Sequence, residues 1–336
     1  MTDPAARQPA ARLGEASGEA RAGDTLLVAL TFDLDPDSFD SSIDTHRTTH
    51  MTWRGIEEGV PAILDILERA GAEAGRRAKA TWFVRADDHI AAVYGDGGAL
   101  LDRHESLLGK LSAAGDEIGW HPNLYRRIGE RWERETDDDA LAAQMRRGAK
   151  AMRARGWRPQ CSRIGENMGS NRIMQTLEDL GFRYDSTAMP GRSRDDGERR
   201  FDWRDTPETP YRPGRADYRR PGEPALNLTE VPMTMVPVIA DYDVAPISRY
   251  VDLAFHPRAL RAGLGACLDQ ARLLITVSHP SCVLPGISNR PHGLLSFDIN
   301  AFYENLQLII EECDRLARPL RFVTLSEGAA LFAAMG

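Results

Sequence analysis

The sequence predicts a single α/β domain built around a mostly parallel, barrel-like sheet. Short apolar segments rich in β-branched residues alternate with longer segments of helical periodicity, which is the pattern of βαβ units. The chain has 336 residues, of which 42% are hydrophobic, enough for one large domain with a sizeable core. Neither an internal repeat nor a linker between independent domains interrupts this alternation.

The expected elements follow one another regularly along the chain. The first strand, 26–32, precedes a helix over 57–70 that has an apolar stripe and ends at Gly71. The next strand is 79–84, and a later helix begins after Ser170 as its N-cap and stops at Gly181. The other strands are expected at 117–121, 161–164, 182–185, 226–235, 273–278 and 321–325, and the other helices at 99–114, 138–155, 257–271, 300–316 and from 326 onward.

Two stretches show no such periodicity. Residues 1–24 are rich in Ala, Arg, Gly and Glu, and we expect a disordered tail there. Residues 186–224 are dense in Arg, Pro, Gly and Asp, and so long a loop inside a compact domain is usually a functional lid or disordered. We interpret 25–336 as a single catalytic domain in which 186–224 forms a long active-site loop.

Charge and cysteine usage exclude several classes of protein. A net charge of −8 argues against a nucleic-acid partner, which needs a basic face. No run approaches the roughly 18 apolar residues that a membrane span requires. The N-terminus lacks the apolar core of a secretory signal, which predicts a cytoplasmic protein. The four cysteines, which we expect to be ordinary buried thiols, contain no C-x-x-C pair; they are Cys161, Cys267, Cys282 and Cys313.

Two carboxylates follow the first strand. In parallel α/β folds the active site lies at the carboxyl ends of the strands, so polar residues there are the first candidates for function. Asp33 and Asp35 point to the same side if the strand persists, because the side-chain period of a strand is two. One can then bind a cation while the other acts as a general base on a water molecule. The alternative is an acidic loop that caps the next helix.

Two histidines, each followed by proline, occupy equivalent positions. His121 ends the strand 117–121, and His279 follows the strand 273–278. Neutral imidazole is a common zinc ligand, although a lone histidine after a strand is more often structural. Two histidines and two carboxylates that all lie at strand ends are much harder to obtain by chance, and together they predict a metal-assisted active site.

Further polar and aromatic residues could complete the site. Arg163 and Glu166 follow the strand 161–164, where they could orient a catalytic carboxylate and contact substrate, or form a surface ion pair of little energetic value. Trp203, Tyr211 and Arg212 lie in the long loop. They could stack on a sugar ring and bind it, or they could anchor the loop.

Six short motifs, taken in order, resemble those of NodB-like polysaccharide deacetylases, which form carbohydrate esterase family 4. They span roughly 26–325 in the expected order and spacing. The motifs are Thr31-Phe-Asp-Leu-Asp35, Lys79-Ala-Thr-Trp-Phe-Val84, Asp116-Glu-Ile-Gly-Trp-His121, Ser162-Arg-Ile-Gly165, Tyr184-Asp-Ser-Thr187 and Thr276-Val-Ser-His-Pro280.

The resemblance implies a distorted (β/α) barrel of seven or eight strands and a bound divalent metal ion, most simply zinc. It also implies a role for each matching residue. Asp33 corresponds to the general base and Asp35 to a metal ligand. His121 corresponds to a second ligand, Arg163 to the residue that orients the base, and His279 to the general acid.

The sequence departs from the family pattern at one position. The second motif usually has another histidine four residues after the first, where this chain has Tyr125. Asn123 is nearby, but its amide suits harder cations better than zinc. The third ligand therefore stays open among Asn123, Tyr125, His46, His50 and His279. The metal could be held differently or weakly, or catalysis could be lost.

These observations lead to one main hypothesis and three alternatives. The main hypothesis is metal-assisted removal of an acyl group, N-acetyl or O-acyl, from a small or oligomeric sugar-containing substrate. The first alternative is a catalytically silent barrel that acts as a binding protein. The second is a metal hydrolase of another C–N bond. The third is a glycosidase that uses Asp33 and Glu166, which would have to lie about 5–10 Å apart across the sugar.

Overall fold

The computed structural model describes residues 25–37, 51–73, 75, 77–129, 131–195, 200–287 and 293–335. The tail predicted at 1–24 lies outside these residues, as do His46 and His50, two candidates for the third metal ligand.

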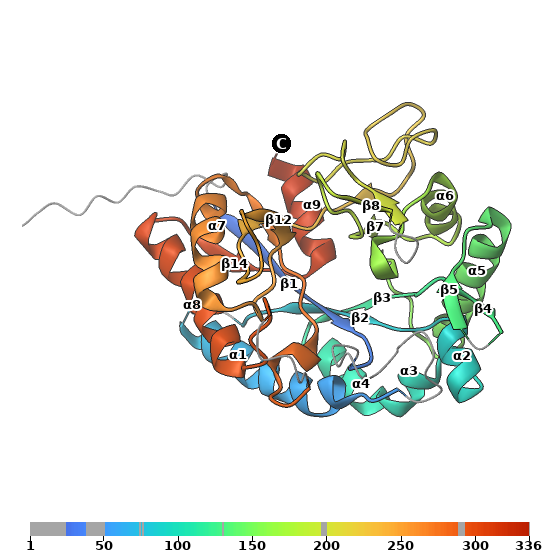
Figure 1. Ribbon diagram of the computed structural model, residues 1–336, viewed down its shortest axis with the longest axis horizontal. Helices are drawn as coiled ribbons and strands as arrows, with labels where there is room; N and C mark the ends of the chain where they lie inside the picture. Colours follow the sequence, from blue (N-terminus) through green and yellow to red (C-terminus); the bar gives the residue numbers. More distant parts are fainter. Residues whose placement is uncertain are drawn as a thin grey trace, which may run out of the picture.

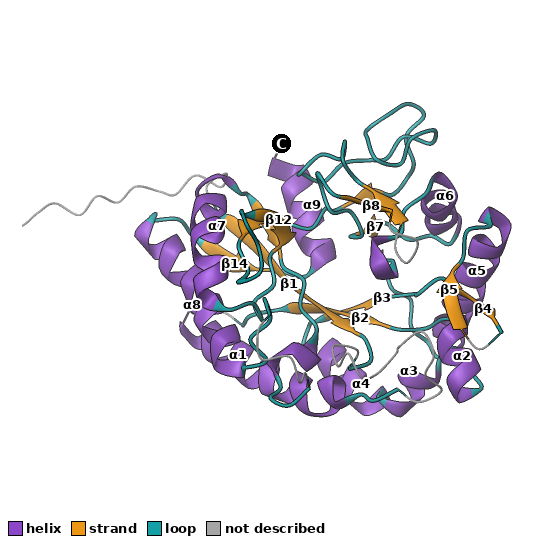
Figure 2. Ribbon diagram, viewed as in Figure 1, coloured by secondary structure: helices purple, strands orange, loops and turns teal. Residues whose placement is uncertain are grey.

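Seven parallel strands curl into an open half-barrel at the centre of the molecule (Figure 2). Their order across the sheet is β10–β7–β6–β3–β2–β1–β13. An eighth strand, β14 (Leu320–Phe322), pairs with the first half of β1, and β2 pairs with the second half. The predicted fold class is confirmed. The bounds are β1 (Leu26–Leu34), β2 (Ala80–Val84), β3 (Glu117–Trp120), β6 (Cys161–Ser162), β7 (Tyr184–Asp185), β10 (Thr229–Glu230) and β13 (Leu273–Ile275).

Helices cover the outside of the sheet in a continuous arc from α8 through α1, α4, α3 and α2 to α5 and α6 (Figure 1). Ser170 caps α6 as predicted, because its Oγ accepts a hydrogen bond from the Ile173 N–H at 3.1 Å. The helix predicted over 99–114 is instead two helices that meet at His104, and α2 was not predicted. The bounds are η1 (Gly55–Gly59), α1 (Val60–Glu73), α2 (Asp88–Tyr94), α3 (Ala99–Arg103), α4 (Glu105–Ala113), α5 (Asp138–Ala154), η2 (Gly165–Asn167), α6 (Asn171–Asp179), α7 (Pro257–Gln270), η3 (Pro280–Val283), α8 (Ile299–Arg315) and α9 (Leu325–Met335).

The alternation of β1 separates the core into two parts and fixes the direction of the carboxylates. Val28 and Leu30 point outward and belong to the large cluster beneath the helices. Leu27 and Ala29 point into the half-barrel, where they form a smaller cluster with Leu325 of α9 and its neighbours. Because the side-chain period of a strand is two, Asp33 continues the inward-facing row. The interior of the half-barrel thus changes from apolar to acidic along one strand.

Three antiparallel hairpins lie outside the central sheet, and the sequence did not predict them. They are β4–β5 (Tyr125–Ile128 and Arg131–Arg134), β8–β9 (Ser193–Asp195 and Arg200–Asp202) and β11–β12 (Met235–Val238 and Ile247–Tyr250). The single strand expected at 226–235 is also wrong. It is divided between β10 and the first residue of β11, because the chain leaves the sheet after Glu230.

Two expectations from composition hold within the described residues. None of the helices there is long and apolar enough to cross a membrane. The four cysteines are free thiols, of which Cys161, Cys282 and Cys313 are buried and Cys267 is half-buried.

Candidate functional site

A central cavity of about 390 Å³ opens at the carboxyl ends of the parallel strands. It is lined by residues that end β1 or follow β2, β3, β6 and β13, as expected for a parallel α/β sheet. Its polar side chains are Asp33, Asp35, Asp37, Thr52, Arg85, His89, His121, Asn123, Tyr125, Arg163, Glu166, Asn167, Arg192, Arg194, Tyr250 and His279. The five residues predicted to perform the chemistry are all present.

Arg163 holds the carboxylate of Asp33 in a fixed position. The guanidinium is 1% exposed, and Nη1 donates to Asp33 Oδ1 at 2.9 Å and to Thr31 Oγ1 at 2.8 Å. Nε and Nη2 donate to the carbonyl oxygen and the hydroxyl of Ser186 at 2.9 and 3.1 Å. The guanidinium also lies 4.4 Å from the centre of the Phe83 ring. An arginine held on every side cannot move without breaking several buried bonds, so it can orient Asp33.

Two imidazole rings converge on one oxygen of Asp35. Nε2 of His121 lies 3.2 Å from Asp35 Oδ2, and Nε2 of His279 lies 3.6 Å from the same oxygen. Burial raises the pKa of Asp35, but the charge and hydrogen bonds of the two histidines outweigh this and hold the pKa well below its usual value. Burial likewise lowers the pKa values of His121 and His279, and the nearby carboxylates reverse the shift, so both pKa values are raised.

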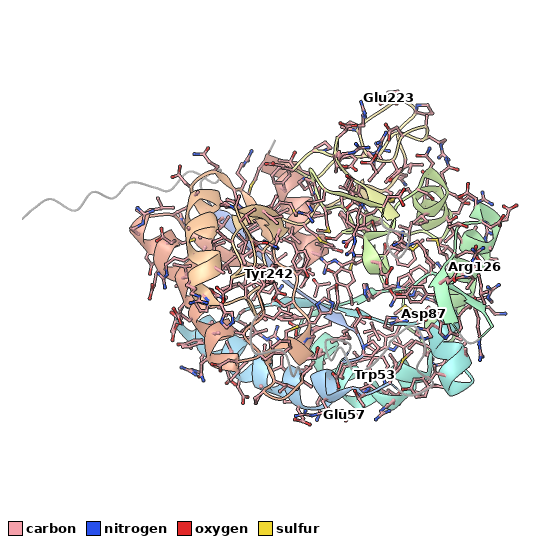
Figure 3. The ribbon with its side chains drawn as sticks, viewed as in Figure 1. Trp53, Glu57, Asp87, Arg126, Glu223 and Tyr242 are labelled. Atoms are coloured by element: carbon pink, nitrogen blue, oxygen red, sulfur yellow. The ribbon has the colours of Figure 1, made fainter. Side chains whose placement is uncertain are left out.

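Arg85 and Asp87 form a buried pair beside Asp35 that the sequence reasoning missed. Nε and Nη2 of Arg85 donate to Asp87 at 2.5 and 3.0 Å, and Nη1 donates to Asp35 Oδ1 at 3.2 Å. Asp87 also caps α2 by accepting from the Ile90 N–H at 3.0 Å. Figure 3 shows Asp87 between the strands and α2. Both residues follow β2, so the rule that polar residues at strand ends deserve inspection could have found them.

Asp252 is a second residue that the sequence reasoning missed. It is 1% exposed, and its Oδ1 accepts hydrogen bonds from Ser278 Oγ at 2.6 Å and from the Ala254 N–H at 2.9 Å. Burial raises the pKa of Asp252 to about 6, against the hydrogen bonds and the charge of His279, which lower it. The carboxylate of Asp252 is thus hydrogen-bonded to Ser278, the residue directly before His279. It follows a hairpin strand instead of a predicted sheet strand, so no pattern in the sequence marks it.

Tyr125 and Glu166 are hydrogen-bonded to each other in the structure. Tyr125 Oη donates to Glu166 Oε1 at 2.6 Å, and Arg134 Nη2 donates to Glu166 Oε2 at 3.3 Å. Burial and the adjacent Glu166 raise the pKa of Tyr125 well above its usual value, so the phenol is neutral. Glu166 lines the cavity as predicted, but both its oxygens are engaged. Tyr125 therefore does not replace the family's second histidine as an anionic ligand.

Asn123 also lines the cavity. Its side-chain oxygen packs so closely against Gly165 that a Cβ added there would lie 1.5 Å from it. The side chain is thus wedged against the loop after β6.

The long loop reaches the cavity with other residues than those predicted. Its lining side chains are Met189, Arg192, Arg194 and Phe201. Trp203 is fully buried and donates from Nε1 to the Asn167 carbonyl oxygen at 2.9 Å. Tyr211 is 7% exposed and donates to the Tyr218 carbonyl oxygen, and Arg212 donates to the Leu226 carbonyl oxygen.

None of these three residues lines the cavity, so the structure matches the anchoring alternative for them instead of direct contact with a sugar. Beyond β9 the loop projects from the body of the molecule, with Glu223 near its outer end (Figure 3).

The donor atoms of Asp35 and His121 fit a divalent cation. Nδ1 of His121 donates to the Arg163 carbonyl oxygen at 2.7 Å, so in the neutral ring the lone pair of Nε2 is directed toward Asp35. Such a bond to the second ring nitrogen is usual for metal-binding histidines. The 3.2 Å between the two donor atoms is close to the roughly 3.3 Å expected for two ligands with zinc bonds of about 2.0–2.2 Å.

A complete cage is not formed. Over the described residues, no group of three or more His, Cys, Asp or Glu side chains is arranged to hold a metal ion. The residues present therefore fit a cation bound through Asp35 and His121 alone.

The sequence and the fold were compared with those of known proteins. Neither a protein-family model nor a curated protein matches the sequence. A proposed polysaccharide deacetylase from Mycobacterium smegmatis is 20% identical, with a TM-score of 0.54, and the match covers 97% of this chain and 95% of that one. A proposed glycoside hydrolase/deacetylase from Parabacteroides distasonis is 12% identical, with a TM-score of 0.61, and the match covers 93% and 72%. The fold of this chain is therefore that of the polysaccharide deacetylases, shared over nearly its full length at low sequence identity.

Proposed function

We propose that the protein is a metal-dependent hydrolase that removes an acyl group, in the first instance N-acetyl, from a sugar-containing substrate. One observation supports this most strongly. A carboxylate fixed by a buried arginine lies at the same strand ends as a second carboxylate that faces two imidazoles, and all of them line one cavity. This arrangement offers a base, a cation site and an acid within reach of one bound molecule.

Asp33 is the proposed general base. Its Oδ1 is held by Arg163, so only Oδ2 is left to take a proton from the attacking water. The buried hydrogen bonds of Arg163 keep that oxygen in one place, and such positioning is a large part of what an enzyme contributes to rate. Arg163 is thus a positioning residue and does not itself react.

His279 is the proposed general acid. Burial lowers its pKa, but the hydrogen bond to Asp35 and the neighbouring carboxylates outweigh this and raise it, which favours the protonated ring whose Nε2 can give a proton to the leaving amine or hydroxyl. Asp252 stabilises the charged ring through space, as the carboxylate partners of catalytic histidines do. Asp33 would thus accept the proton from water, and His279 would donate the proton to the leaving group.

Asp35 and His121 are the proposed ligands of the cation, and zinc suits this mixed oxygen and nitrogen donor set. When bound, the cation supplies electrophilic activation of the acyl carbonyl and of the nucleophilic water. Arg85 holds the second oxygen of Asp35, which leaves Oδ2 as the one oxygen that faces His121.

Two measurements on the purified protein test this proposal. Metal analysis should find about one equivalent of a divalent ion, and acetate should be released from N-acetylated sugars. Asp33→Asn should abolish most of the release. Asp241→Asn, an exposed aspartate that pairs with Arg258, is the matched control and should not. Acetate release that persists in Asp33→Asn would contradict the proposed chemistry.

A silent binding barrel is the second candidate, and one observation favours it. The described residues provide no three-residue metal cage, and a weakly held cation could leave the site inactive. This alternative expects sugar binding without acetate release and without bound metal. A hydrolase of another C–N bond would contain metal and ignore N-acetyl sugars, so the same two measurements separate all three.

A further inference from the structure

The carboxylates that line the central cavity are compensated by groups of the protein itself. Asp33 is paired with Arg163, and Asp35 with Arg85 and the histidines. Asp37 accepts from the backbone N–H groups of Arg54 and Gly55 at 2.8 and 2.9 Å, and Glu166 is held by Tyr125 and Arg134. A substrate therefore meets no bare negative charge in the described part of this cavity.

Arg192 is not compensated in this way. It is half-buried, lines the cavity, and donates from Nη1 to the carbonyl oxygen of Ser248 at 3.0 Å. No described carboxylate forms an ion pair with it. Burial lowers the pKa of Arg192, and so do the like charges of Arg249 and Arg194. Removing a cation from water without an anionic partner costs free energy. A bound anion would offset that cost.

The backbone holds Arg192 rigidly at this position. The Trp203 N–H donates to the Arg192 carbonyl oxygen at 2.8 Å, and the Gly191 N–H donates to the Trp203 carbonyl oxygen at 3.0 Å. Trp203 is itself fully buried. On the other side, the guanidinium reaches β12 through Ser248. The side chain thus bridges the β8–β9 and β11–β12 hairpins, and a guanidinium held in this way is already placed for a ligand.

We propose that the substrate carries an anionic group, phosphate or carboxylate, which Arg192 binds while the acyl group lies over Asp33 and Asp35. This inference rests on the proposed function, since it names the class of acylated sugar that the same cavity accepts. A guanidinium can bind either anion through two parallel hydrogen bonds. Arg194, which is exposed and also lines the cavity, adds positive charge on the same side.

Binding measured by calorimetry on the full chain, in an Asp33→Asn background that the proposed function expects to be inactive, tests the inference without turnover. The ligands are N-acetylglucosamine 1-phosphate, N-acetylmuramic acid and the neutral N-acetylglucosamine. At least one anionic ligand should bind about tenfold or more tightly than the neutral one, as expected for a charge-assisted contact. Arg192→Gln should abolish that preference and leave the neutral sugar within about twofold. Whichever anion loses affinity identifies phosphate or carboxylate as the group.

Two variants act as controls. Arg192→Lys keeps the charge and should retain part of the preference, whereas Arg258→Gln removes an equal charge from an exposed position on α7 and should retain all of it. Equal binding of neutral and anionic sugars, binding of none of them, or an anion preference that Arg192→Gln leaves intact would overturn the inference. Acetate release from a neutral sugar would still support the proposed function in each case, so the two failures are distinguishable.

Discussion

Asp35 presents one carboxylate oxygen to His121 at 3.2 Å and the other to Arg85 at 3.2 Å. The same side chain thus faces both a permanent cation and the imidazole proposed to bind a metal. The guanidinium of Arg85, which is held by Asp87, repels a second cation at Asp35. The neutral imidazole of His121, in contrast, can bind one. We therefore expect a cation here to be exchangeable, and the predictions that follow separate its binding from the proton transfers.

Asp33 and Asp35 should differ in what their amide variants lose. Asp33→Asn should keep the metal and lose activity by about 10²–10⁴-fold or more, because it removes a general base. Asp35→Asn should lose metal and activity together. Metal content and kcat/KM of both variants check this. Loss of metal from Asp33→Asn would show that the two roles are assigned the wrong way round.

His279→Ala should retain metal and lose activity according to the leaving group. An amine must be protonated as its bond to carbon breaks, whereas the phenolate of an activated aryl ester departs as a stable anion. The variant should therefore be far less impaired on an aryl acetate than on an N-acetyl sugar. If His279→Ala strips the metal instead, His279 is a ligand, and the acid must be sought elsewhere.

Asp252→Asn should lower kcat with little effect on KM. Its carboxylate, with a pKa near 6, is charged above about pH 6 and there stabilises the protonated His279. Without that charge the pKa of His279 falls, so as the pH is raised the rate of the variant should decline at a lower pH than that of the wild type. Rates measured from pH 5 to 8 test this. An unchanged profile would remove Asp252 from the mechanism.

Glu230→Gln should stabilise the fold at alkaline pH. Burial first, and then the charge of Asp185, raise the pKa of Glu230 well above its usual value. The folded state therefore binds a proton that the unfolded state releases, so stability falls as pH rises from about 4.5 through the raised pKa. Glutamine mimics the protonated acid. Urea unfolding at pH 5 and 8 should show a smaller loss for the variant, while the exposed Glu304→Gln should follow the wild type.

Trp203→Ala should destabilise the protein by about 3–5 kcal/mol, since the indole is fully buried and its N–H is hydrogen-bonded. Tyr242→Ala, at a position 66% exposed, should change the melting temperature little (Figure 3). A melting temperature that holds in Trp203→Ala, together with a raised KM for a neutral sugar, would instead support sugar contact, the other alternative that the sequence left open.

The strand-end rule brought the candidate residues to one cavity because their positions depend on local order along the chain. Asp33 and Asp35 lie at the end of a strongly apolar strand, and His121 and His279 each follow one. Where β-rich segments alternate with helices, parallel pairing brings such ends together, whatever the details of packing. The fold and the main candidates could thus be read from the sequence.

Residues fixed by long-range contacts could not be predicted in the same way. Trp203 lies in a charged segment, so the sequence left open whether it stacks on a sugar or anchors the loop, and the structure packs it against Asn167 and Tyr218. Asp252 follows a hairpin strand of mixed polarity, which has no alternation to recognise. Arg192 owes its position to a backbone pairing across the hairpin. In each case the partner lies far away in the sequence or in a segment without periodicity.

The separation between the central sheet and the added hairpins has a consequence for how such a protein can change. The proposed reacting groups lie at the ends of parallel strands, whereas β8–β9 and β11–β12 contribute part of the rim and add no strand to that sheet. A hairpin of another length or charge could be exchanged without disturbing the register of β1 against β2. Replacing the rim hairpins could therefore change which substrates are bound while the proposed reacting groups stay in place.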